Sequence, residues 1–364
     1  MDRRKFLQSL AILGSSTALP SHAHNTGSFS TEVLPLPAKS ATEDCDLHNS
    51  KPDEPNAKIG IIAIGGAGGA IFSRVAAGLP YLDRAIAIDT NPFALHQLPA
   101  DRKILVGSGK RTLYEPSIPR SVARQFSDDV ANAASGLHLA LILSGMGGVT
   151  GTAISPIVAQ TLHRMDIPAL GIVTTPFDFE GRRCMQVAQN GLDALDHYAT
   201  TVLPISNEVL SRNTGENALM ASVLDRTQLT FEKLYRNIAS FAGGNSWVGI
   251  DFEDVRVVLN ERHRSAFGFA SANGNDYAEY ATRNAILSPL LGQNNLRLAS
   301  GVLVAVEGKP GFARLGQINR VWDIIKQNVS PKAHLLVSIT VADHAEDFSV
   351  SILATGLPGA SIQI

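Results

Sequence analysis

One ten-residue stretch, SGMGGVTGTA at 144–153, constrains the fold more than any other part of the chain. The apolar run LHLALIL before it is typical of a buried strand, and the apolar spacing of AISPIVAQTLHRM after it favours a helix. A strand, a glycine-rich loop and a helix in this order form an anion site, because backbone N–H groups and the positive helix N-terminus face the ligand. The hydroxyls of Thr150 and Thr152 stand at the helix entry, where we expect them to cap the helix or donate to phosphate.

A second glycine-rich segment, GGAGG at 65–69, lies in the same kind of setting. It follows KIGIIAI at 58–64, a continuous apolar run typical of a parallel strand covered on both faces, and it precedes the helical stretch AIFSRVAAGL. The next predicted strand, 84–88, ends at Asp89, and such an acid also marks ribose recognition in dinucleotide-binding proteins. Because GGAGG lacks the strict GxGxxG spacing, a nicotinamide oxidoreductase is the weaker alternative, and two phosphate loops at neighbouring strands are favoured.

Composition narrows the class of protein. The 364 residues allow two domains with real cores, and 45% hydrophobic with 18% charged residues fits a globular protein. The net charge of −2 implies no nucleic acid or acidic membrane as partner. Ten histidines without an HExxH or paired spacing predict no metal site, and the two cysteines, Cys45 and Cys184, are predicted to be isolated thiols.

The N-terminal residues 1–23 have the layout of an export signal. A basic start at 3–5 is followed by a modest apolar stretch and by small residues up to Ala23, where cleavage is expected; RRKFLQ resembles a twin-arginine signal. This predicts export to the periplasm or anchoring in the inner membrane, with the cytoplasm as the alternative. Residues 24–56, rich in Ser, Pro and Asn, are predicted to be a flexible linker.

The rest of the chain divides around one long predicted helix. From Asn217 to Phe241, 25 residues, apolar side chains recur at helical spacing, which favours a spine between two domains. We predict a nucleotide-binding domain at 57–216, the central helix at 217–245, a C-terminal domain at 246–358 and a tail at 359–364. Within the C-terminal domain, strands are predicted at 266–272, 301–306, 334–341 and 348–354, and helices at 277–286 and 315–327.

Four motifs in order resemble the tubulin/FtsZ superfamily, over about 300 residues from Lys58 to Leu357. SGMGGVTGTA is similar to the signature phosphate loop. VTTPFDFEGRR is similar to the segment that ends on a ribose-binding Glu, here Glu180, and PISNEVL to the segment that carries a guanine-contacting Asn, here Asn207. GIDFEDV is similar to the loop whose acids, here Asp251 and Asp254, serve the neighbouring subunit.

The resemblance implies an α/β fold: a Rossmann-like parallel-sheet GTPase domain, a long central helix and a smaller α/β second domain. It implies binding of GTP and GDP with Mg²⁺, hydrolysis of GTP to GDP and phosphate, and head-to-tail filaments in which Asp251 and Asp254 of one subunit are catalytic on the next. The implied partner is the chain itself, with no tail peptide for membrane adaptors and membrane contact only through the N-terminus. The implied nucleotide-binding residues are Gly65, Gly66, Gly68, Gly69, Gly145, Gly147, Gly148, Thr150, Gly151, Thr152, Glu180 and Asn207.

The chain also departs from the family pattern, and the departures keep a second hypothesis open. A non-catalytic paralogue, which binds nucleotide weakly or serves a structural or regulatory role, is the alternative to a GTPase. The positions concerned are Ala70 and Gly249 where the family has Asn, Cys184 where it has Arg, Gln228 or Leu229 where the central helix has Asp, and YEPSIP at 114–119 where it has a glycine-rich loop.

Overall fold

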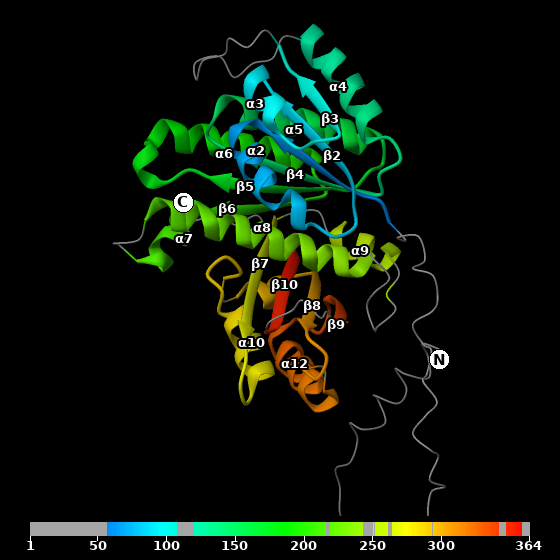
Figure 1. Ribbon diagram of the computed structural model, residues 1–364, viewed down its shortest axis with the longest axis vertical. Coiled ribbons are helices and arrows are strands. Elements are labelled where there is room, and N and C mark those ends of the chain that lie inside the picture. Colours follow the sequence, from blue (N-terminus) through cyan, green and yellow to red (C-terminus); the bar gives the residue numbers. More distant parts are fainter. Residues whose placement is uncertain are drawn as a thin grey trace, which may run out of the picture. The chain divides into compact units, whose positions relative to one another are not determined.

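The computed structural model describes residues 57–107, 120–215, 219–242, 250, 252–260, 264–292, 294–312, 314–341 and 347–358 (Figure 1). The described residues belong to one compact unit, Lys51–Ile364. The predicted export signal, linker and tail, the YEPSIP segment and Asp251 lie outside the described residues. Within the described part of the chain, no helix has both the length and the apolar character needed to span a membrane.

The strands are β1 (Ile59–Ile64), β2 (Leu82–Asp89), β3 (Arg102–Leu105), β4 (Leu139–Gly145), β5 (Ala169–Thr175), β6 (Thr201–Ser206), β7 (Arg264–Ala272), β8 (Gly301–Gly308), β9 (His334–Val341) and β10 (Phe348–Leu357). The helices are α2 (Gly65–Val75), η1 (Ala76–Gly78), α3 (Pro92–Gln97), α4 (Arg120–Ala134), α5 (Val149–Arg164), η2 (Asp178–Glu180), α6 (Arg182–Tyr198), α7 (Asn207–Thr214), α8 (Met220–Ala242), α9 (Phe252–Leu259), α10 (Tyr277–Ile286), α11 (Asn295–Leu298) and α12 (Leu315–Asn328).

The described strands form one sheet in the order β3-β2-β1-β4-β5-β6-β7-β10-β8-β9. The pairs from β3 to β6 are parallel, as the alternation of strands and helices in the first domain predicts. In the second domain β10 is antiparallel to both β7 and β8, and β8 is parallel to β9. The predicted α/β architecture is confirmed, with both domains contributing strands to the same sheet.

Two apolar layers cover the parallel part of the sheet. On one face, Ile61 of β1 belongs to a cluster that includes Phe72 of α2 and Phe231 of α8. The next residue, Ile62, points the other way into a cluster that includes Val158 of α5. Because successive strand residues are buried on opposite faces, β1 needs an uninterrupted apolar sequence, which is what the sequence pattern predicted.

Helix α8 connects the two halves of the sheet through buried polar contacts. The hydroxyl of Tyr235 donates to the carbonyl of Pro80 at 2.8 Å, just before β2. The amide of Asn237 donates to the carbonyl and to Oγ of Ser351 in β10, each at 3.0 Å. Burial raises the pKa of Tyr235, so its hydroxyl keeps the proton that this contact needs. The predicted central helix is therefore confirmed, and it contacts both halves of the sheet.

The two halves also meet where β6 pairs with β7, at Val202 and Arg264. The Arg264 side chain, 11% exposed, donates through Nε to Asp196 of α6 at 2.6 Å. A charge buried this deeply needs an opposite charge, and α6 supplies it. The sequence pattern did not predict this junction, because it depends on contacts between residues far apart in the chain.

The hydrogen bond from Tyr235 of α8 to the carbonyl of Pro80 should contribute measurably to stability. Tyr235→Phe removes the hydroxyl and leaves the ring, so the free energy of unfolding should fall by about 1 kcal/mol in urea denaturation. Tyr280→Phe, on a side chain that is 60% exposed, is the matched control and should leave stability unchanged. Equal stability of Tyr235→Phe and the wild type would show that the contact with Pro80 contributes nothing.

Candidate functional site

The two glycine-rich segments meet at the carboxyl ends of neighbouring strands. β1 and β4 pair in parallel, with Ile64 beside Ser144, and their chain connections lead directly into α2 and α5. The strand order reverses between β1 and β4, and in open parallel sheets ligands bind in the crevice outside such a reversal. Both helix N-termini therefore lie at one edge of the sheet, where their partial positive charges favour an anion.

The first glycine segment differs from its prediction in one respect. The sequence predicted a loop followed by a helix, but α2 begins at Gly65, so the glycines form its first turn. The reason is close packing: a Cβ on Gly68 would lie 2.2 Å from the carbonyl oxygen of Leu143 in β4. Without side chains, the helix can start at the end of β1 and run against the neighbouring strand.

The glycines divide into two groups according to what a side chain would meet. In the first group a Cβ would collide with a neighbour or crowd it, so these glycines permit close packing. On Gly151 it would lie 2.2 Å from the carbonyl oxygen of Gly145, and on Gly145 it would lie 2.6 Å from Cβ of Ala67. Gly65, with φ of +69°, would bring its Cβ 3.2 Å from Cβ of Thr150, and Gly69 would bring its own 3.0 Å from Leu98.

The second group consists of Gly66 and Gly148, which are exposed and would have nothing within 4 Å of a Cβ. Gly66 lies in the first turn of α2, and Gly148 is the residue before the first turn of α5. The first-turn N–H groups of a helix have no partner within the helix. The backbone at these two glycines is thus open to a ligand, whereas the other glycines shape the segments that present it.

The two threonines of the second segment do not cap α5, so of the two predicted roles, capping the helix or donating to phosphate, the first is wrong. Gly148 is the N-cap, and Thr150 and Thr152 lie within the first turns of the helix. Oγ1 of the buried Thr152 accepts from the N–H of Gly147 at 3.0 Å, so this hydroxyl holds the loop. Oγ1 of Thr150, which is half-buried, lies 3.1 Å from Oγ1 of Thr90 and ties α5 to the end of β2.

Gly147 connects this loop with the segment after β5. Its φ is +97°, a conformation that side chains rarely adopt, and a Cβ there would lie 2.6 Å from Sγ of Cys184 and 2.7 Å from Pro176. The loop therefore lies directly against the start of α6. Cys184, which the sequence analysis placed where the family pattern has Arg, thus lies next to the phosphate-loop candidate.

Glu180 lies at the end of η2, which is the next element along the chain after β5. Its side chain is exposed, and Oε1 accepts from the N–H of Phe177 at 2.9 Å while the thiol of Cys184 lies 3.7 Å from Oε2. Each carboxylate oxygen has two lone pairs, so these contacts orient the group and leave acceptor sites for hydroxyls. Glu180 can therefore serve both as a local cap and as a ligand group.

Asn207 begins α7, directly after β6. The cap of this helix is Ser206, whose Oγ accepts from the N–H of Val209 at 3.2 Å, so capping does not explain the Asn. Within the described residues, the buried Oδ1 of Asn207 has no hydrogen-bond partner. A buried acceptor without a donor costs about 1–3 kcal/mol, and an N–H group of a ligand would remove that cost.

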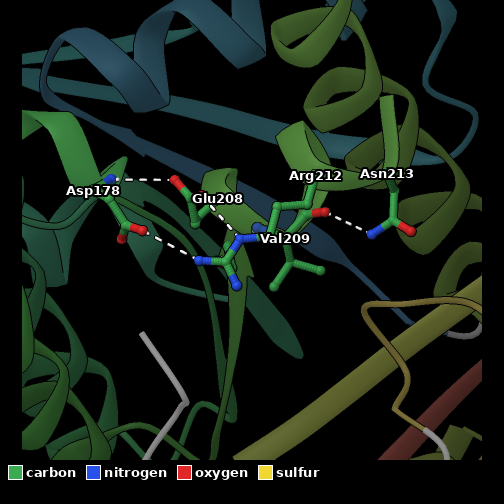
Figure 2. Close-up of polar contacts among 6 residues, drawn as sticks. Asp178, Glu208, Val209, Arg212 and Asn213 are labelled. Atoms are coloured by element: carbon green, nitrogen blue, oxygen red, sulfur yellow. Dashed lines mark hydrogen bonds and ion pairs between the residues drawn. The ribbon is translucent and has the colours of Figure 1, made fainter. Parts of the chain in front are cut away.

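Contacts that the sequence analysis missed join the segments of Glu180 and Asn207 (Figure 2). Arg212 of α7 donates through Nε to Glu208 at 3.0 Å and through Nη2 to Asp178 of η2 at 3.2 Å. The N–H of Asp178 in turn donates to Oε2 of Glu208 at 3.2 Å. The spacing of Glu208 and Arg212 by four residues is a visible helical signal, but nothing in the sequence pairs them with Asp178.

Asp254, one of the two predicted catalytic acids, does not lie with the glycine segments. Asp254 is half-buried in the first turn of α9, which packs against α8, β8 and β9. Asp251 is outside the described residues. The candidate site within one chain thus comprises the ends of β1, β4, β5 and β6, and Asp254 belongs to the other half of the sheet.

Two further observations limit what the site can hold. Asp89, the acid that the nicotinamide alternative requires, is buried and accepts from the N–H of Asn91 at 2.9 Å, so it serves the local turn. Among the residues that the structure describes, no group of three or more His, Cys, Asp or Glu side chains is placed to hold a metal ion. Mg²⁺ commonly binds through substrate phosphate oxygens and waters, which requires no such group.

The division of the glycines predicts different effects of the same substitution. Gly68→Ala forces a Cβ into the Leu143 carbonyl, so unfolding free energy should fall by about 3 kcal/mol or more. Gly66→Ala adds a Cβ in open space and should leave stability equal or slightly higher. Urea denaturation of both variants measures this, and an equal cost at the two positions would contradict the packing role of Gly68.

Cys184 gives a second test of the local geometry. Burial, followed by the negative charge of Glu180, raises the pKa of its thiol. In a Cys45→Ser background, iodoacetamide should therefore label the folded chain more slowly at neutral pH than a urea-unfolded chain. The midpoint of the pH dependence of the labelling rate should lie at higher pH in the folded chain. Adding Glu180→Gln should shift the midpoint downward. A midpoint at or below that of the unfolded chain would contradict the claim that burial and Glu180 raise the pKa of the Cys184 thiol.

Two family descriptions match the chain in order. The Tubulin/FtsZ family, GTPase domain, matches residues 58–215, which contain the glycine segments, Glu180 and Asn207. The FtsZ family, C-terminal domain, matches residues 264–358, which contain the strands from β7 to β10. The two matches fall on either side of α8.

Relatives named cell division protein FtsZ resemble the chain over most of its length. The protein of Caulobacter vibrioides is 31% identical over 322 residues, covering 87% of this chain and 63% of the relative, so the chain spans less than two thirds of that protein. The protein of Pseudomonas aeruginosa is 31% identical over 312 residues, covering 84% and 79%. FtsZ 2 of Rhizobium meliloti is 32% identical over 314 residues, covering 84% and 89%.

Solved structures agree with the fold. An empty FtsZ dimer from M. jannaschii matches with a TM-score of 0.75 and 26% identity, covering 82% of this chain and 88% of that one. CetZ2 from Haloferax volcanii, a GTPγS-bound protofilament, matches with a TM-score of 0.68 and 20% identity, covering 83% and 93%. The second likeness concerns the fold alone.

Proposed function

The chain belongs to the Tubulin/FtsZ family, and from that premise we propose that it binds GTP and GDP at the carboxyl ends of β1, β4, β5 and β6. One observation carries the proposal. The open backbone at Gly66 and Gly148 and the unpartnered Oδ1 of Asn207 follow strands of the same parallel sheet. Backbone N–H groups that can bind an anion and an amide oxygen that can accept an N–H of a base thus follow strands at the same edge of the sheet.

The described residues divide the binding work between two regions. Gly66, Gly148 and the half-exposed hydroxyl of Thr150 would contact the phosphates, supported by the two helix N-termini. Glu180 would accept from ribose hydroxyls, and Oδ1 of Asn207 would accept an N–H of the base. Mg²⁺, bound to the phosphate oxygens, would supply neutralisation of their negative charge.

Hydrolysis in this proposal needs a second copy of the chain. Asp254, and Asp251 near it in sequence, would reach the nucleotide of the next subunit and orient the attacking water. The position of α9 away from the glycine segments supports this division, because one chain does not bring both parts of the site together. Head-to-tail contact of unlike surfaces generates filaments, and the FtsZ dimer among the structural relatives supports self-assembly.

The second candidate, a non-catalytic nucleotide-binding paralogue, is favoured by the surroundings of Glu180. This carboxylate already contacts the N–H of Phe177 and the thiol of Cys184, which stands where the family pattern has a cation. A thiol offers no positive charge to a phosphate or ribose. Turnover therefore decides between the two candidates.

Asp254→Ala should leave nucleotide binding intact and slow turnover by about a hundredfold, since a group that orients the reacting water typically contributes that much. Purified full-length protein with GTP and Mg²⁺ is assayed for phosphate release and for sedimentation of filaments. Glu253→Ala removes the neighbouring acid, which pairs with Arg256 at 3.1 Å, and serves as the control with near-normal turnover.

Two outcomes would contradict the catalytic proposal. Equal turnover of Asp254→Ala and the wild type would remove Asp254 from the reaction. A wild-type protein that binds GTP and releases no phosphate, with or without sedimentation, would favour the non-catalytic candidate.

A further inference from the structure

The segments that carry Glu180 and Asn207 are short, and they follow two neighbouring strands of the sheet. η2 has three residues and α7 has eight, and they follow the paired strands β5 and β6. α7 packs on α8 and β5, whereas η2 packs on α6, so the two elements are held mainly by different neighbours. Direct contacts between them therefore add to what fixes their separation. In the proposed site, that separation decides whether one nucleoside can reach both side chains.

Arg212 bridges the two segments with two hydrogen bonds from one guanidinium group (Figure 2). Nε donates to Oε1 of Glu208 at 3.0 Å within α7, and Nη2 donates to Oδ2 of Asp178 at 3.2 Å in η2. Glu208 completes the connection, because its Oε2 accepts the N–H of Asp178 at 3.2 Å. The planar guanidinium fixes both acceptors at once, which a flexible ammonium group does not do.

The contacts around Arg212 continue along α7. The amide of Asn213 donates to the carbonyl of Val209 at 2.7 Å, and the hydroxyl of Thr214 donates to the carbonyl of Leu210 at 2.6 Å. Both are bonds from a side chain to the carbonyl four residues earlier, so they lie within the last turns of α7. Arg212 lies in the C-terminal half of α7, and Asn207 is the first residue of the same helix, directly after its N-cap Ser206.

We propose that Arg212 is a positioning residue for the nucleoside: it holds η2 against α7 and thereby sets the distance between Glu180 and Asn207. The inference rests on the proposed nucleotide site. Arg212 touches no nucleotide in this account and acts through Asp178 and Glu208.

The exposure of the bridge argues for positioning and against a role in fold stability. The side chains of Arg212 and Asp178 are 66% and 52% exposed, and such ion pairs contribute at most about 1 kcal/mol to stability. The glycine segments depend on other contacts, such as those of Thr152 and Thr150. Loss of Arg212 should therefore weaken contacts to ribose and base, and leave contacts to phosphate unchanged.

The test compares GDP with inorganic pyrophosphate, which presents the phosphates without the nucleoside. Calorimetric titration of the full-length Arg212→Ala protein should show a dissociation constant for GDP raised about three- to fivefold. The dissociation constant for pyrophosphate and the melting temperature should stay at their wild-type values. Arg212→Lys keeps the charge without the fork and should recover only part of the GDP affinity.

Two further variants sharpen the result. Arg283→Ala breaks a comparable exposed pair, Arg283 with Glu279 at 2.8 Å in α10, and should bind GDP as the wild type does. Asp178→Ala should weaken GDP binding as Arg212→Ala does, and the double variant should be no weaker than either single one, because both remove the same bridge.

Wild-type affinity of Arg212→Ala for GDP would overturn the inference. So would an equal loss for GDP and pyrophosphate, because that pattern indicates a change of the whole site. A wild-type protein that binds pyrophosphate but neither GDP nor GTP would instead overturn the proposed nucleoside site, and the positioning role with it.

Discussion

Hydrogen bonds between β1 and β4 set Ile64 beside Ser144, so two chain segments leave the sheet at the same point and start α2 and α5 next to each other. Everything proposed for the phosphates depends on this parallel pairing. It is maintained by apolar layers on both faces and by glycines that let α2 and α5 approach the β4 backbone, as at Gly68 and Gly151. At Gly66 and Gly148 nothing lies near the position of a Cβ, so the backbone there is open to an anion.

The nucleoside side of the site is built on a different principle. Glu180 and Asn207 stand on short segments after β5 and β6, and exposed charges connect those segments. Phosphate contact through packed backbone is difficult to change without unfolding the chain. In the proposed site, contacts to ribose and base depend on side chains that can be exchanged at little cost in stability, which agrees with an intact fold around the predicted departures at Cys184 and at Gln228 or Leu229.

The sequence predicted the strands and the long helix well, because continuous apolar runs follow from burial on both faces of a parallel sheet. It could not assign the glycines individually: GGAGG and SGMGGVTGTA look alike, yet Gly151 packs on a carbonyl while Gly148 faces open space. The threonine roles and the bridge of Arg212 to Asp178 also needed the structure, since each joins residues from separate elements. The domain boundaries, the export signal and the role of Asp251 stay predictions.

The central claim is that the edge formed by β1, β4, β5 and β6 holds a guanine nucleotide. Full-length protein, incubated with a mixture of GTP, ATP and NAD, freed of unbound ligand and heat-denatured, releases whatever the site retained for chromatographic identification. A guanine nucleotide in near-equimolar amount is the predicted result. Release of NAD alone, or of no nucleotide at all, would contradict the claim.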